Sequence, residues 1–310
     1  MPELPEVETM RRTIDGCIGT RVENVERTAC RLKPIHLSPR IDHMRRRLIG
    51  RQITETDRAG KRVVIKFDSG DRLVLEPRMT GLVLVSDPPN AEHLRLRIDL
   101  SAGKSGRRKR NTSDKNASGQ SGTGRNGKAR AGNRPPARQL LYWDRRGLGS
   151  VRLFRPDEFV ATFGLDKLGP DALIITSTVL RERLGDSRRA IKVALLDQRA
   201  VAGIGNLYAS EILHVAQIDP RKRCDRLRKD DWKRVREATS LVLEEAIRYE
   251  GSTLGDGTYR NALNEQGSYQ NHHRVYARAG DLCPRCQQKK VLRIVQAQRS
   301  TFYCPGCQKR

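Results

Sequence analysis

The N-terminus of the chain carries residue types that could attack an electrophilic carbon. The sequence opens Met1-Pro2-Glu3-Leu4-Pro5-Glu6, and loss of the initiator methionine, expected before a small second residue, leaves a proline with a free secondary amine. An α-amino group titrates near pH ~8, so a fraction of it is unprotonated at neutral pH and can form an iminium with such a carbon. Glu3 and Glu6 lie within one helical turn of this amine, and a carboxyl group at that distance can act as the general acid.

The same residues also suit the start of a helix. Proline is tolerated in the first helical turn, and acidic side chains there interact favourably with the helix dipole. An apolar stripe at helical spacing follows through Leu4, Val7 and Ile14. We therefore predict a leading helix and keep both interpretations, because they are compatible.

Four of the seven cysteines form two Cys-x-x-Cys pairs near the C-terminus. Cys283 pairs with Cys286 and Cys304 with Cys307, and seventeen residues separate the pairs. This spacing is typical of a zinc ribbon, in which two turns of a β-hairpin close on one tetrahedral ion. Because four thiolates fill the coordination shell, the sequence predicts one structural Zn²⁺.

Composition and charge restrict the class of protein. The chain has 310 residues and a hydrophobic content of 36%, which predicts about two globular domains. Its net charge of +25 predicts a polyanionic partner. Nucleic acid is favoured over an acidic membrane because no stretch reaches the ~18 apolar residues of a spanning helix. No secretory n-region and h-region precede the first charged helix, so a cytoplasmic protein is expected.

The two halves of the chain differ in their local patterns. β-branched segments joined by turns predict an antiparallel sandwich or barrel in the first half. These predicted strands are residues 22–28, 63–67, 73–75, 82–85, 94–98 and 140–143. Apolar periodicity predicts helices in the second half, at residues 190–198, 207–215 and 231–249. The fold class is therefore predicted to be α+β.

A basic insertion interrupts the predicted strands at residues 101–138. It contains eleven Lys or Arg residues against one Asp and has no apolar periodicity. We expect it to be disordered, because it cannot bury enough apolar surface to offset its chain entropy. Two roles remain open, a mobile tether for phosphates and an inert spacer.

A glycine-rich turn at residues 201–206 joins two of the predicted helices. Helices around such a turn can aim backbone N–H groups at a phosphate, and Lys192 just upstream could add positive charge. A simple helical hairpin with a solvated surface lysine is the alternative, since the two kinds of turn look alike in sequence.

Three stretches of the chain closely resemble the formamidopyrimidine-DNA glycosylases. They are residues 2–8, 203–211 and 297–304, and the likeness runs over nearly the whole chain except the insertion. The resemblance implies a leading helix on an N-terminal antiparallel β-sandwich, followed by a helix-two-turns-helix domain and a four-cysteine zinc finger. The implied boundaries are residues 1–155 for the catalytic domain, 156–275 for the DNA-binding helical domain and 276–310 for the zinc-finger hairpin.

The resemblance also implies a reaction and its catalytic residues. Such enzymes excise oxidised purines such as 8-oxoguanine and formamidopyrimidines from duplex DNA, then cut the abasic strand by β- and δ-elimination. Pro2 would be the nucleophile at the sugar C1′, and Glu3 the acid that helps to open the sugar ring. Lys61 matches a proton donor for β-elimination, and Arg299 is implied in the last elimination step.

A second set of residues is implied in DNA binding. Lys192, Asn206 and Arg299 match phosphate contacts, whereas the others act at the base or beside it. The implied DNA-binding residues are Glu6, Met79, Arg146, Leu148, Lys192, Asn206 and Arg299. Met79, Arg146 and Leu148 would fill the gap left by an extruded base.

The chain departs from the family pattern at the loop with Arg146. The family motif is Asp-Pro-Arg-Arg-Phe-Gly, whereas this chain reads Asp144-Arg-Arg-Gly-Leu-Gly149. Leucine cannot stack as phenylalanine does, so interrogation of normal base pairs is expected to be weaker. Without the resemblance, Met79 and Leu148 would be assigned to the core.

Other readings differ in substrate or in class. Endonuclease VIII acts on oxidised pyrimidines and shares the amine, the turn and the zinc finger, but it opens Pro-Glu-Gly-Pro-Glu, and Leu4 here favours the purine branch. A non-catalytic DNA-binding protein is a further alternative, against which Pro2, Glu3 and Lys61 argue. We expect a cytoplasmic, nucleoid-associated bacterial monomer acting on double-stranded DNA with oxidised bases or abasic sites. The loop at residues 251–280 is expected to cover the extruded base.

Overall fold

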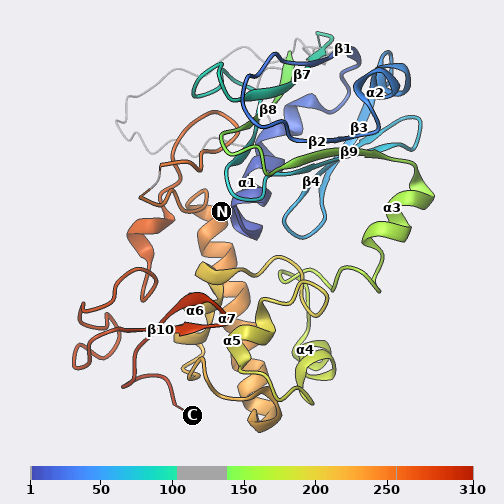
Figure 1. The fold of residues 1–310 in the computed structure, drawn as a ribbon. Helices are drawn as coiled ribbons and strands as arrows, with labels where there is room; N and C mark the ends of the chain where they lie inside the picture. The colour runs from blue at the N-terminus through green and yellow to red at the C-terminus, as the bar shows by residue number, and fades with distance from the viewer. Residues whose placement is uncertain (1, 103–137, 256, 310) are drawn as a thin grey trace, which may run out of the picture.

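The computed structural model describes residues 2–102, 138–255 and 257–309. An upper domain of β-strands and a lower domain of helices are joined along helix α1, as Figure 1 shows. The basic insertion, apart from residues 101, 102 and 138, lies outside the described residues, and so does the prediction made for it.

Helix α1 (Leu4–Thr13) packs against both domains. Leu4 belongs to the core of the helical domain, whereas Val7 and Met10 belong to the core between the sheets. A short 3₁₀ turn, η1 (Ile14–Cys17), continues the helix and buries Ile14. The structure therefore confirms the predicted helix, and the buried side chains of α1 anchor the N-terminus in both cores.

Two sheets form the sandwich of the N-terminal domain. The four-stranded sheet has the order β1-β7-β8-β6, and the five-stranded sheet has the order β2-β9-β5-β4-β3. The strands of the first sheet are β1 (Val22–Arg27), β6 (Gly81–Leu84), β7 (Leu94–Leu100) and β8 (Gln139–Asp144). Those of the second are β2 (His36–Ser38), β3 (Ile53–Arg58), β4 (Val63–Phe67), β5 (Arg72–Glu76) and β9 (Ser150–Phe154). All six predicted strands are present.

Four elements of this domain were not predicted from the sequence: strands β2, β3 and β9 and helix α2. Strand β2 pairs with β9 in parallel, although the other strand pairs of the sandwich are antiparallel. The edge strand β3 has few apolar residues because one of its faces is open to solvent. Helix α2 (Ile41–Leu48) buries only Met44 and Leu48, so its apolar stripe is short.

The helical domain begins after β9. Its helices are α3 (Pro156–Phe163), α4 (Ser177–Leu184), α5 (Ile191–Leu195), α6 (Asn206–Val215) and α7 (Lys229–Arg248), with 3₁₀ turns η2 (Cys224–Arg226) and η3 (Tyr269–His272). The three helices predicted in this half correspond to α5, α6 and α7, of which α5 is shorter than predicted. The glycine-rich turn brings the N-terminus of α6 against the start of α1, since the Leu4 amide donates to the Gly203 carbonyl at 3.1 Å.

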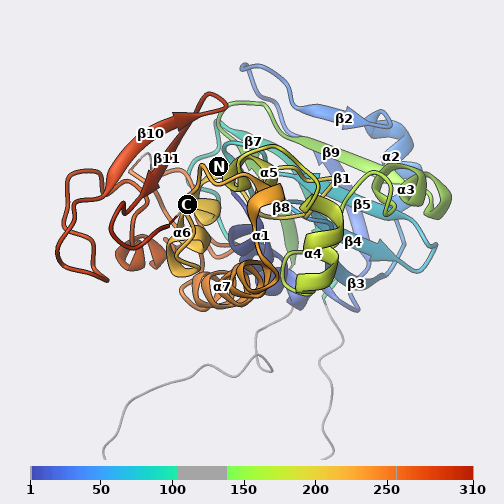
Figure 2. The ribbon, with the colours of Figure 1, turned by 90° about the horizontal axis from the view of Figure 1, so that it is seen from below.

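A hairpin of β10 (Leu292–Gln296) and β11 (Arg299–Tyr303) follows, and residues 304–309 complete the described chain. Seen from below in Figure 2, it lies beside α6. Its own small core contains Val275, Val291 and Phe302 together with two cysteines. Among the described residues, no helix combines the length and apolar character needed to cross a membrane.

Candidate active site and nucleic-acid interface

The Glu3 carboxylate sits against the N-terminus of helix α6. Its Oε1 accepts a hydrogen bond from the Leu207 amide at 3.1 Å, where the helix dipole favours negative charge. Gly205 makes this approach possible, because any Cβ there would overlap the carboxylate. The other oxygen, Oε2, is buried and has no hydrogen-bond partner among the described residues. A buried oxygen of this kind at the wall of a cavity is a candidate functional group.

The buried Glu6 carboxylate holds the Glu3 backbone in place. Its Oε2 accepts from the Glu3 amide at 2.8 Å, and its Oε1 accepts from the Tyr208 hydroxyl at 2.5 Å and the Ser252 amide at 2.9 Å. Burial raises the pKa of Glu6, and the nearby Glu3 carboxylate acts in the same direction. Because protein donors occupy both oxygens, Glu6 orients Glu3 and the loop at Ser252, and its contact with DNA stays a prediction.

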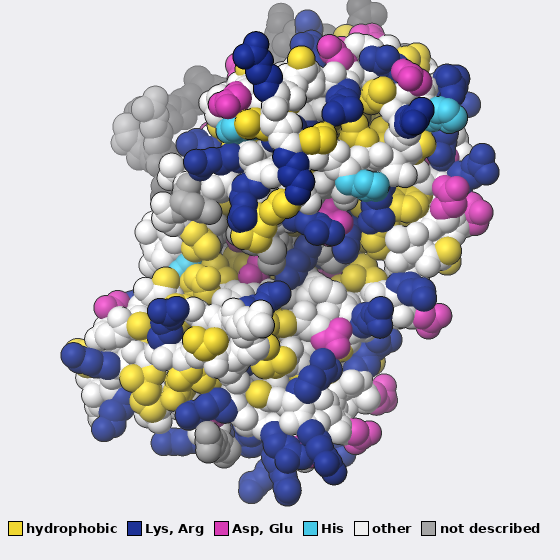
Figure 3. Space-filling view, viewed as in Figure 1, with side chains coloured by type: hydrophobic (Ala, Val, Ile, Leu, Met, Phe, Trp, Pro, Cys, Tyr) yellow, Lys and Arg dark blue, Asp and Glu magenta, His cyan; other side chains and the backbone are white. Residues whose placement is uncertain are grey.

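A cavity of about 450 Å³ opens beside the two carboxylates. Its walls come from the N-terminal residues, the loop at Met79, helix α6, the loop after α7 and the hairpin. The lining residues are Glu3, Glu6, Met79, Asn206, Leu207, Ser252, Leu254, Thr258, Tyr259, Tyr276, Arg299 and Ser300. In Figure 3 the surface is hollowed between the two domains, and Lys and Arg side chains gather along the edges.

Three cationic side chains gather around Glu3. Lys192 is fully buried, and its Nζ donates to Asn206 Oδ1 at 2.6 Å. Burial lowers the pKa of Lys192 to about 8, and Arg299 adds to this while Glu3 opposes it. Burial also lowers the pKa of Lys61, and Arg299 again contributes. This concentration of positive charge is suited to an anion such as a phosphate.

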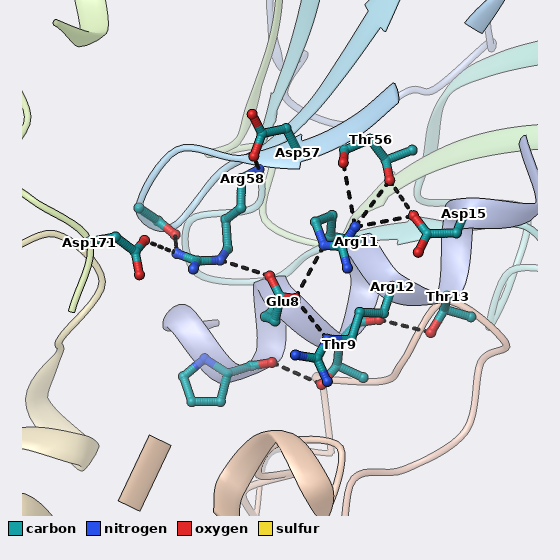
Figure 4. A network of polar contacts seen from close by, with 12 residues as sticks. Glu8, Thr9, Arg11, Arg12, Thr13, Asp15, Thr56, Asp57, Arg58 and Asp171 are labelled. Atoms are coloured by element: carbon teal, nitrogen blue, oxygen red, sulfur yellow. Dashed lines mark hydrogen bonds and ion pairs between the residues drawn. The ribbon is translucent and has the colours of Figure 1, made fainter. Parts of the chain in front are cut away.

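Arg58 holds the hairpin that carries Lys61. In Figure 4 its guanidinium lies between Glu8 on α1 and Asp171, which follows α3. Its Nε donates to Glu8 Oε2 at 3.0 Å, and its Nη1 donates to Asp171 Oδ2 at 2.6 Å and to the Gly60 carbonyl at 3.0 Å. The link spans both domains, because it joins the turn before Lys61 to α1 and to Asp171 of the helical domain.

Met79, Arg146 and Leu148 lie on two neighbouring loops of the sandwich. Met79 is 37% exposed and borders the cavity, which is unusual for a methionine with an apolar core nearby. Arg146 is exposed and Leu148 is half-buried. The structure therefore places Met79 at the surface of the hollow, where a core residue would not lie.

The four cysteines of the C-terminal pairs converge on one point. Their sulfur atoms all lie within 4.8 Å of one another, and the Cys283–Cys307 and Cys286–Cys304 sulfur distances are each 3.7 Å. A tetrahedron with Zn–S bonds of about 2.3 Å sets its sulfur atoms about 3.8 Å apart. The cluster therefore fits a metal ion of that size.

The loop at residues 251–280 was expected to cover the base, but the sequence patterns did not indicate which of its residues line the cavity. Ser252, Leu254, Thr258 and Tyr259 come from the loop at 251–280, and Tyr276 follows in the same segment. Tyr259 packs in the core of the sandwich although it lies far along the chain. No periodic pattern marks these residues, because their positions depend on the docking of an irregular loop against the other domain.

Known proteins share this arrangement of sequence and structure. The family model for the formamidopyrimidine-DNA glycosylase N-terminal domain matches residues 1–114, and that for the formamidopyrimidine-DNA glycosylase H2TH domain matches residues 168–257. A formamidopyrimidine-DNA glycosylase of Chloroflexus aurantiacus is 34% identical, over 99% of this chain and 98% of that protein. This chain belongs to the formamidopyrimidine-DNA glycosylase family.

Solved structures of this family extend the likeness to the whole fold. The Lactococcus lactis Fpg in complex with an abasic site containing DNA has a TM-score of 0.77 at 28% identity, covering 99% of this chain and all of that one. MutM in complex with carbocyclic 8-oxo-G containing DNA has a TM-score of 0.76 at 28% identity, with full coverage of both chains. The family assignment and the α+β fold made from the sequence are thus confirmed, and the protein is a DNA glycosylase.

Proposed function

We propose that this protein removes oxidised purines, among them 8-oxoguanine and formamidopyrimidines, from duplex DNA and then cuts the abasic strand by β- and δ-elimination. The observation that carries the proposal concerns Glu3, the residue after Pro2. Its buried Oε2 accepts no hydrogen bond from the part of the chain that the structure describes, and Glu3 lines a cavity beside cationic side chains. The cavity has the size to hold an extruded base and its sugar.

The chemistry follows from the amine and the carboxyl group. With Met1 removed, the Pro2 nitrogen attacks the sugar C1′, the C1′–N bond to the base breaks, and the base leaves with a proton. Glu3 donates a proton to the ring oxygen as the sugar opens, which leaves an iminium between Pro2 and C1′. Loss of a C2′ proton then expels the 3′ phosphate, and a second elimination expels the 5′ phosphate. Lys61 and Arg299 serve these two steps.

Phosphate binding and base extrusion use the remaining residues. Asn206 and Arg299 line the cavity beside Glu3, and the buried Lys192 donates to Asn206. These three residues would therefore bind the backbone phosphates beside the lesion. Met79, Arg146 and Leu148 would fill the gap in the duplex.

An excision assay tests the proposed substrate. Duplexes containing 8-oxoguanine, a formamidopyrimidine or an oxidised pyrimidine, each placed opposite cytosine and adenine, are incubated with the protein. We expect the purine lesions to be released fastest, as the complex of MutM with carbocyclic 8-oxo-G containing DNA suggests. Faster release of pyrimidine lesions would favour endonuclease VIII-like activity, and no release at all would favour a non-catalytic DNA-binding protein.

DNA affinity is expected to fall as the pH rises through the pKa of Lys192. This pKa lies near 8 in the unbound protein, and a bound phosphate favours the charged lysine, so binding takes up a proton above that pH. The affinity should fall by up to about tenfold per pH unit above about 8. Anisotropy of labelled duplex at constant ionic strength measures it. Lys192→Arg stays charged and should show a shallower pH dependence; an equal dependence in both proteins would contradict the assignment.

We also propose that the four cysteines bind one structural Zn²⁺. Replacing Cys304 by Ser should release the metal and disorder the hairpin that carries Arg299, because metal binding supplies much of the folding energy of a small ribbon. Metal analysis should find one zinc per wild-type chain, and DNA binding should weaken in the variant. Cys17→Ser serves as the control, since Cys17 is buried in the sandwich core. Full DNA binding by metal-free protein would overturn the proposal.

A further inference from the structure

Two loops of the sandwich carry the side chains that we assign to the gap in the duplex. The Met79 loop comprises residues 77–80 between β5 and β6, and the Arg146 loop comprises residues 145–149 between β8 and β9. The exposed residues of both loops lie next to buried polar anchors. Thr80 is 5% exposed, and Asp144, which directly precedes the Arg146 loop, is fully buried.

The Asp144 carboxylate connects the two loops. Its Oδ1 accepts from the Thr80 hydroxyl at 2.5 Å and from the Arg146 amide at 3.2 Å, and its Oδ2 accepts from the Gly149 amide at 2.8 Å. The Arg146 amide also donates to the Thr80 hydroxyl oxygen, at 3.0 Å. One buried carboxylate thus binds both ends of the Arg146 loop and the end of the Met79 loop.

Tyr142 supports the same junction from below. Its hydroxyl donates to the Glu76 carbonyl at 2.7 Å, just before the Met79 loop. A Cβ at Gly149, which ends the Arg146 loop, or at Gly81, which follows the Met79 loop, would collide with this hydroxyl, so both positions require glycine. The two loops therefore both pack on Tyr142 and both bind the Asp144 carboxylate.

Arg95 fixes the backbone at the centre of the junction. This residue is 3% exposed, and its Nε donates to the Asp144 carbonyl at 2.9 Å. The Asp144 amide donates to the His93 carbonyl at 2.9 Å. Asp144 is consequently held through its backbone and through both carboxylate oxygens.

These contacts allow little independent motion of either loop. Hydrogen bonds to a charged acceptor are stronger than neutral ones, and leaving a buried carboxylate with an empty position is unfavourable. Moving one loop away from the other breaks the buried hydrogen bond between Thr80 and Asp144. A prearranged pair of loops also loses less conformational freedom when it enters the duplex.

We propose that Asp144 and Thr80 are positioning residues that couple the two loops, so that Met79 and Arg146 enter the duplex together. This inference rests on the proposed function. Base extrusion needs unpairing and unstacking, whereas a site that already lacks its base needs neither. Loosening the coupling should therefore slow the removal of a paired lesion far more than cleavage at a preformed abasic site.

The experiment removes the hydroxyl of Thr80 and leaves its shape. Single-turnover rates are measured for Thr80→Val on a duplex with 8-oxoguanine and on one with a preformed abasic site, and 2-aminopurine beside the lesion reports extrusion. We expect excision and the 2-aminopurine signal to slow together by about tenfold to a hundredfold, the effect of losing one hydrogen bond to a charged group. Cleavage at the abasic site should change much less.

Two further variants separate coupling from a general loss of stability. Thr80→Ser keeps a hydroxyl and should restore most of the rate. Thr239→Val removes an equally buried hydroxyl, which donates to the Val235 carbonyl in α7, and should leave both substrates unaffected.

Two outcomes would overturn the proposal, and a third would overturn only the proposed function. An equal slowing of Thr80→Val on both substrates, with a lower melting temperature, would reduce the residue to a structural role and overturn the proposal. Unchanged excision and an unchanged 2-aminopurine signal would overturn it as well. If the wild-type protein excises no oxidised base, the proposed function fails, whereas the coupling is still judged by comparing the 2-aminopurine signals of wild type and Thr80→Val.

Discussion

Borohydride is expected to trap a covalent complex between this protein and lesion-containing DNA. The iminium between the Pro2 nitrogen and C1′ is reduced to a stable amine, so protein and DNA should run together on a denaturing gel. A variant with one alanine inserted before Pro2 has an amide at that nitrogen and cannot form the iminium. Trapping should therefore disappear in the extended protein.

The inserted residue could also disturb the site, so binding serves as the control. Pro2 is buried beside Glu3, and the extended protein is compared with wild type for affinity to a duplex that carries an uncleavable abasic analogue. Retained affinity with lost trapping would assign the chemistry to Pro2. Trapping by the extended protein would remove Pro2 as the nucleophile.

Glu3→Gln should show the second large loss of activity. The amide cannot donate the proton that opens the sugar ring, and general acids of this kind contribute about 10²- to 10⁴-fold to the rate. Glutamine can still accept the hydrogen bond from the Leu207 amide, so DNA binding should be nearly unchanged. Single-turnover excision of 8-oxoguanine measures the effect.

A surface variant and a measurement of DNA affinity complete the test of Glu3. Glu237→Gln changes an exposed glutamate on α7 and should excise at the wild-type rate. Unchanged excision by Glu3→Gln would argue against Glu3 as the acid. A parallel loss of DNA affinity would point instead to a collapsed junction between α1 and α6.

Several features of the protein could be predicted from local sequence. The spacing of the four cysteines predicts their convergence, because Cys-x-x-Cys turns and a hairpin bring the sulfur atoms together over short distances along the chain. The apolar stripe of α1 and the alternation in strands such as β4 depend on the burial of one face, which periodicity records. Pro2 and Glu3 were found through their chemistry and their place at the N-terminus.

Only the tertiary structure decided which groups meet around these residues. The Leu207 amide reaches Glu3 across 204 positions of the chain, Ser252 reaches Glu6 across 246, and Asp144 reaches Thr80 across 64. No local propensity specifies such contacts. They exist because α1 packs into two cores at once and because irregular loops dock on rigid sheets and helices. For the same reason, the parallel pairing of β2 with β9 and the residues that line the cavity could not be predicted from local sequence patterns.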